Sequence, residues 1–90
     1  MSGPTEKPLL EFPCEFPIKA MGLARNDFEL LITDLVRQHA PDLTQADVSS
    51  RPSKEGKYIS ITLTVTATSR EQLDAIYYAL TDCEHVLMSL

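Results

Sequence analysis

The chain has 90 residues, which suffice for one domain but not for two, since domains usually span about 50 to 250 residues. Eight Lys and Arg against thirteen Asp and Glu give a formal net charge of −5, which disfavours binding to nucleic-acid phosphates. Hydrophobic residues make up 43% of the chain and charged residues 23%, a balance typical of globular rather than disordered proteins. We therefore expect one folded domain and no nucleic-acid partner.

Residues 1–8 contain a glycine and two prolines, so we expect a flexible tail there and a single domain over residues 9–90. No apolar stretch approaches the roughly 20 residues that span a bilayer, and the N-terminus lacks the features of a signal peptide. Cys14 and Cys83 are too few and too far apart for a disulfide framework. The chain is thus expected to be cytoplasmic, with no membrane partner.

The first half of the domain predicts a strand followed by a helix. Residues 15–21 alternate between apolar and polar side chains, as a half-buried strand does. Asn26, with Glu29 three residues later, forms a capping-box pattern that starts a helix. Ala40-Pro41 ends this helix, because proline disfavours helical geometry in the residue before it. The apolar face of the helix has residues at helical spacing: Phe28, Leu31, Ile32, Leu35, Val36 and His39.

The second half predicts two more strands, a helix and a final strand. Residues 47–53 form a weak strand that a turn at 54–57 connects to the strongly alternating run 58–68. Ser69, followed by Gln72, caps a helix that runs to about Leu80. Residues 84–90 alternate again as a strand. Its helix-facing residues are expected to be Val86, Met88 and Leu90, and its outward-facing residues His85, Leu87 and Ser89.

The resulting order, βαββαβ, predicts an α+β ferredoxin-like sandwich, in which a four-stranded antiparallel sheet carries both helices on one face. Residues 15–21 and 58–68 should form the two central strands. The open face would then present Lys19, Thr62 and Thr64 to water, a ligand or a second sheet. In this topology Cys14 and Cys83 are too far apart to form a disulfide.

The sequence shows no catalytic constellation, and we expect no cofactor. Cys14, Cys83, His39 and His85 include soft metal ligands, but the predicted fold separates them, so no metal site is expected. His39 is interpreted as a residue at the end of the first helix that bonds a carbonyl. RNA-recognition motifs share this element order, but they need aromatic residues where this sheet has lysine and threonine.

The loop between the first strand and the first helix is the most site-like segment, and its candidate ligand-binding residues are Gly22, Arg25 and Asn26. Gly22 has a position similar to the glycine of ACT domains, which lets an effector approach backbone amides. Arg25 precedes a helix N-terminus, as in the anion site of acylphosphatases, although this loop has fewer glycines. A plain strand-to-helix turn is the alternative interpretation.

Several segments together resemble the YbeD-like family of small bacterial proteins of uncharacterised function. These segments are Leu10–Pro13, Phe16–Gly22, His39-Ala40-Pro41, Arg51-Pro52-Ser53, Gly56-Lys57-Tyr58 and Val86–Leu90. The family resembles ACT regulatory domains in fold, which implies a regulatory or ligand-sensing role and carries over no catalytic residue.

We therefore expect a non-enzymatic regulatory module that binds a small metabolite or a regulated protein, as a homodimer. One alternative is a protein–protein interaction module without a small ligand. The other is an acylphosphatase-like hydrolase that uses Arg25.

Overall fold

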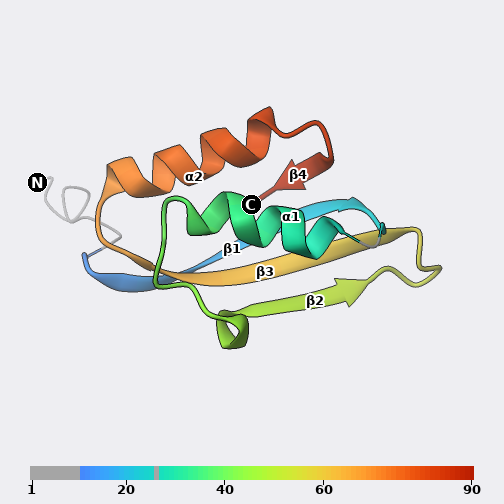
Figure 1. The fold of residues 1–90 in the computed structure, drawn as a ribbon, viewed down its shortest axis with the longest axis horizontal. Helices are drawn as coiled ribbons and strands as arrows, with labels where there is room; N and C mark the ends of the chain where they lie inside the picture. Colours follow the sequence, from blue (N-terminus) through green and yellow to red (C-terminus); the bar gives the residue numbers. More distant parts are fainter. Residues whose placement is uncertain (1–10, 26) are drawn as a thin grey trace, which may run out of the picture.

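A computed structural model describes residues 11–25 and 27–90, and the predicted tail at residues 1–8 lies outside these residues. Within them the chain forms one antiparallel sheet with strand order β2-β3-β1-β4 and two α-helices on the same side of it (Figure 1). The elements are β1 (Cys14–Leu23), α1 (Phe28–Arg37), the short 3₁₀ helix η2 (Gln45–Asp47), β2 (Val48–Pro52), β3 (Tyr58–Ala67), α2 (Arg70–Asp82) and β4 (Val86–Ser89). The predicted βαββαβ order and the two central strands, β1 and β3, are confirmed.

β1 and β3 pair along their whole length, from Cys14 opposite Ala67 to Leu23 opposite Tyr58. Their alternation buries one face, as the sequence predicts. Pro17 is tolerated within β1 because its nitrogen points away from β3, on the side where β4 pairs only with Ala20–Gly22.

The helices cover the buried face of the sheet through a shared hydrophobic core. Phe28, Ile32 and Val36 of α1 are fully buried, as are Ile76 and Leu80 of α2. The strands contribute six further core residues, which are Ile18, Ala20, Ile61, Leu63, Val65 and Ala67. Burial of this face, rather than helix propensity alone, holds two short helices in place.

The helix ends differ in part from the expectation. The predicted cap Asn26 lies outside the described residues, and the N-cap of α1 is Asp27, whose side chain makes no cap hydrogen bond. α1 ends at Arg37, so His39 follows the helix instead of lying on its last turn. The cap of α2 is confirmed, since the hydroxyl of Ser69 accepts a hydrogen bond from the Gln72 amide.

β4 corrects the predicted facing of the last strand. Gly22 pairs with Val86 and Met21 with Met88, so Leu87 is an extra residue in a bulge between them. The bulge shifts the alternation by one residue. Val86 faces the core as predicted, whereas Ser89, opposite the buried Ala20, lies on the helix side and not on the open face.

Met88 and Leu90 therefore lie on the open face instead of under the helices. Met88 is the partner of Met21, and Leu90 exchanges backbone hydrogen bonds of 2.8 and 3.0 Å with Lys19, so both share the face of those residues. Met88 is 52% exposed and Leu90 67%.

Cys14 and Cys83 are both free thiols, in agreement with the prediction that they form no disulfide. In the part of the chain that the structure describes, neither helix is long and apolar enough to cross a membrane.

Candidate functional site

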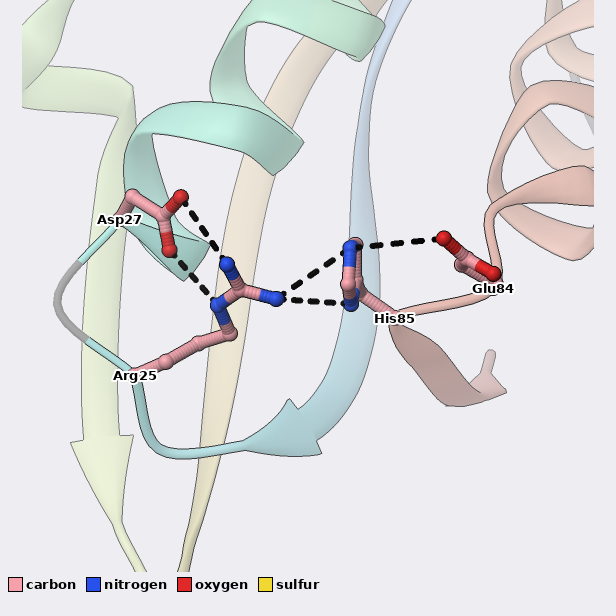
Figure 2. A network of polar contacts seen from close by, with 4 residues as sticks. All are labelled: Arg25, Asp27, Glu84 and His85. Atoms are coloured by element: carbon pink, nitrogen blue, oxygen red, sulfur yellow. Dashed lines mark hydrogen bonds and ion pairs between the residues drawn. The ribbon is translucent and has the colours of Figure 1, made fainter.

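The loops before α1 and before β4 meet at one end of the sheet, where Arg25 connects them (Figure 2). Its guanidinium forms an ion pair with Asp27, with Nε 2.8 Å from Oδ1. Its Nη1 lies 2.9 Å from Nδ1 of His85 and donates to the imidazole. Glu84 approaches the same ring, with 3.9 Å between the carboxylate and Nε2. We name these four residues the Arg25 network.

Solvent weakens the electrostatics of the Arg25 network. The side chains of Arg25 and His85 are 45% and 38% exposed, and that of Glu84 is 88% exposed. Exposed ion pairs of this kind contribute little to stability because water screens them. The network therefore orients two loops but contributes little to the free energy of folding. Its guanidinium is partly exposed to solvent.

Gly22 lies beside the Arg25 network, but its surroundings are filled by the protein. A β-carbon at this position would meet the backbone oxygen of His85 and two ring carbons of Phe28, the latter at 2.6 and 2.7 Å. This close approach explains why the strand needs glycine here. The structure thus brings Gly22 and Arg25 to one corner of the fold, whereas Asn26 lies outside the described residues.

The structure groups the predicted open-face residues on the central strands. Lys19 pairs directly with Thr62. Thr64 pairs with Pro17, and this is the next pair along the same face of the sheet. Both threonines are partly exposed. The open face is thus hydroxyl-rich in its middle.

A group of exposed apolar side chains at the β1–β4 side of the sheet was not predicted as a site. Its five members are between 37% and 67% exposed. We call this group the apolar corner, and it consists of Met21, Leu23, Leu87, Met88 and Leu90. The bulge at Leu87 adds Met88 and Leu90 to the open face, where strict alternation of the sequence did not place them.

The opposite end of the sheet has a cavity of about 390 Å³ between β3 and the segment that follows α1. His39, Asp42 and Asp47 line one side, and Thr64 and Thr66 the other. The imidazole of His39 makes no hydrogen bond to the described residues, in contrast to the predicted bond with a carbonyl. Its backbone oxygen instead accepts a 2.8 Å hydrogen bond from Gln72. The segment His39-Ala40-Pro41, which the sequence marks as a helix end and as part of the family resemblance, forms one side of this cavity.

Across the described residues, no three His, Cys, Asp or Glu side chains converge as ligands of a metal ion.

The family described as "Protein of unknown function (DUF493)" matches residues 7–90, nearly the whole chain. The chain belongs to this family. The resemblance to YbeD-like proteins inferred from the sequence is thereby confirmed.

Curated relatives in the DUF493 family are similar over most of their length. A "UPF0250 protein" of Chromobacterium violaceum is 52% identical over 91% of this chain and 92% of its own. A second, of Nitrosomonas europaea, is 44% identical over 96% and 99%. A third, of Neisseria meningitidis serogroup A, is 46% identical over 91% and 90%. These names describe no activity, so the family is uncharacterised.

A solved structure supports the fold of this DUF493 protein. The solution structure of HP0495 from H. pylori matches with a TM-score of 0.72 at 15% sequence identity, and the match covers 100% of this chain and 94% of the other. The ferredoxin-like α+β fold is therefore shared, while the identity is too low to transfer a function.

Proposed function

We propose that this protein is a non-enzymatic regulatory module that works as a homodimer joined through the apolar corner. The observation that carries the proposal is the contrast between the two edges of the sheet. β2 has features that protect an exposed edge, namely Arg51, Pro52 and two exposed serines. β4, Val86–Ser89, contains neither a charged residue nor a proline, and its Leu87 and Met88 are exposed. An edge of this kind is typical of a strand that is covered in the working assembly.

A second copy of the chain fits this edge better than a chemically different partner. Antiparallel pairing of β4 with β4 of another copy is self-complementary about a two-fold axis and brings the same apolar side chains together. None of the five residues of the apolar corner is charged. The chain has a net charge of −5, so two copies repel each other most where acidic side chains meet. The apolar corner brings no acidic side chain of its own into the contact, so this repulsion is weaker there than elsewhere on the surface.

The regulatory part of the proposal rests on the position of the Arg25 network. His85 directly precedes β4, so a ligand that moved Arg25 away from His85 would act on the strand at the proposed interface. The loop of Gly22 and Arg25 resembles the position at which ACT domains bind effectors. An anionic metabolite is the ligand class that the half-exposed guanidinium favours.

Light scattering coupled to size exclusion, over a range of protein concentrations, tests the homodimer. We expect a dimer for the natural chain and a folded monomer for Met88→Lys, which places a charge on the interface. Leu30→Lys is the matched control, because Leu30 of α1 is 64% exposed and lies away from the apolar corner. A natural chain that stays monomeric, or a Met88→Lys variant that stays dimeric, contradicts the proposal.

A thermal-shift screen over anionic metabolites tests the ligand arm separately. A saturable rise that Arg25→Ala abolishes supports it. If no metabolite raises the melting temperature of a protein that is dimeric, the ligand part of the proposal is wrong. The protein is then an interaction module without a small ligand.

A further inference from the structure

The cavity between β3 and the segment that follows α1 lies where the pairing of β2 with β3 ends. β2 begins at Val48, opposite Leu63, whereas β3 continues to Ala67. Along β3, the backbone groups of Tyr58 and Thr62 point to the β2 side, and by alternation those of Thr64 and Thr66 do too. Among the described residues, the pairing of β2 with β3 ends at Val48 opposite Leu63, so Thr64 and Thr66 follow the last strand pair on this side. The cavity therefore offers two threonine hydroxyls beside the end of the β2–β3 pairing.

The opposite wall of the cavity is held by side-chain contacts. The amide of Gln72 spans it, because Oε1 accepts from the Thr68 backbone at 2.7 Å while Nε2 donates to the His39 carbonyl at 2.8 Å. Arg37 donates to the carbonyl of Leu43 at 3.2 Å. A site whose walls are fixed before binding loses less entropy when a ligand enters.

The charges around the cavity select the ligand. Its lining includes the carboxylates of Asp42 and Asp47 and contains no lysine or arginine. One oxygen of Asp47 is bonded to the amide and hydroxyl of Thr44, and Asp42 makes no bond to the described residues. The volume, about 390 Å³, is at the lower end of the roughly 300–1,000 Å³ of small-molecule sites. A small cation with its own hydrogen-bonding groups fits both the charge and the size.

We propose that this cavity binds a small organic ammonium compound. The ammonium group lies against Asp42 and Asp47, and a second polar group of the ligand bonds to the hydroxyls of Thr64 and Thr66, which line the other side. The site is at the opposite end of β3 from the Arg25 network, since Thr66 pairs with Glu15 and Ile59 with Gly22. Ligand binding in this cavity therefore does not depend on whether the chain forms a dimer or binds an anion at Arg25.

Residue-resolved NMR titration of the full chain tests this site. The probe is putrescine at up to millimolar concentration, with 1,4-butanediol as its neutral counterpart and succinate as its anionic one. We expect saturable shifts with putrescine confined to residues 39–47 and 64–68, and none there with the other two. Equal responses to the three probes, or putrescine shifts spread over the acidic surface, overturn the proposal.

Matched variants make the assignment specific. Asp42→Asn removes an exposed charge and should weaken putrescine binding about tenfold, because one ionic contact is lost. Thr66→Val removes a hydroxyl at the strand edge and should weaken it less. Asp82→Asn, an exposed carboxylate at the end of α2 outside the cavity, is the control and should leave binding unchanged. Unchanged binding in Asp42→Asn, with the spectrum of a folded protein, refutes the site.

Discussion

The ring of Phe28 lies against the α-carbon of Gly22, so that a β-carbon on this glycine would be 2.6 and 2.7 Å from two ring carbons. Phe28 is fully buried, so its ring cannot swing into solvent to make room. The backbone of His85 closes the same space from the side of β4. This contact joins β1, α1 and the last strand at one point of the core.

Gly22→Ala should therefore lower the free energy of unfolding by about 1–3 kcal/mol, the usual cost of overpacking a core. Urea denaturation followed by circular dichroism measures the change. Gly56 provides the comparison, because its β-carbon would meet nothing within 4 Å while its φ is +76°. Gly56→Asn should be nearly neutral, since asparagine tolerates that conformation. A neutral Gly22→Ala would show that the contact with Phe28 is looser than the structure has it.

The sequence was sufficient to predict the sheet order and most of the core, because alternation in β1 and β3 is strict and each is buried on one face. It was insufficient at β4, where one extra residue, Leu87, reverses the facing of all that follow. A bulge within a run of apolar residues does not change the sequence pattern, so it cannot be predicted from that pattern. The cavity was equally hidden, because it depends on where β2 stops relative to β3.

The candidate site was predicted in part for a related reason. Gly22 and Arg25 are close along the chain, so a loop-based argument could place them together. Arg25 and His85 are separated by 60 positions, and only the β1–β4 pairing brings their side chains within 2.9 Å. Long-range contacts of this kind depend on register, which a single sequence specifies weakly at a short edge strand.

The contact between Arg25 and His85 should contribute little to stability. We expect Arg25→Ala and His85→Ala each to change the free energy of unfolding by less than about 1 kcal/mol, with a coupling of about 0.5 kcal/mol between them. A double-mutant cycle by urea denaturation measures the coupling, and the same cycle with Lys54 in place of His85 is the control. Coupling of several kcal/mol would mean that the pair is far less accessible to water.

The acylphosphatase-like alternative leads to a prediction about the same arginine. Asp27 and His85 already engage the guanidinium, so a phosphate would have to displace them. We expect acyl-phosphate hydrolysis at the rate of buffer alone for both the natural chain and Arg25→Ala. Hydrolysis by the natural chain that disappears in Arg25→Ala would instead establish the enzyme.

Tyr77 should make stability depend on pH only in alkaline solution. Burial raises the pKa of its phenol above the ordinary 10.0, since the phenolate is poorly solvated against the core. The folded state therefore holds this proton more tightly than the unfolded state does. Its stabilising contribution is complete below about pH 10 and is lost as the pH rises through the folded-state pKa.

Urea denaturation at neutral pH and above pH 10 isolates the effect of Tyr77. Tyr77→Phe should reduce the alkaline loss of stability. Tyr78→Phe should not, because Tyr78 is 77% exposed. Identical alkaline profiles for the two variants would contradict the burial of Tyr77.

Gln72 should hold the cavity wall independently of its role in starting α2. Its Oε1 accepts from Thr68, while its Nε2 reaches the carbonyl of His39 on the far segment. Gln72→Glu keeps the acceptor but replaces the donor with a carboxylate oxygen that repels the carbonyl. We expect α2 to stay capped and the amides of residues 39–43 to exchange faster with solvent, whereas Gln72→Ala should weaken both by about 1 kcal/mol. Hydrogen exchange read by NMR separates the two effects, and unchanged exchange at residues 39–43 in Gln72→Glu would show that other contacts, such as Arg37 with Leu43, fix the wall alone.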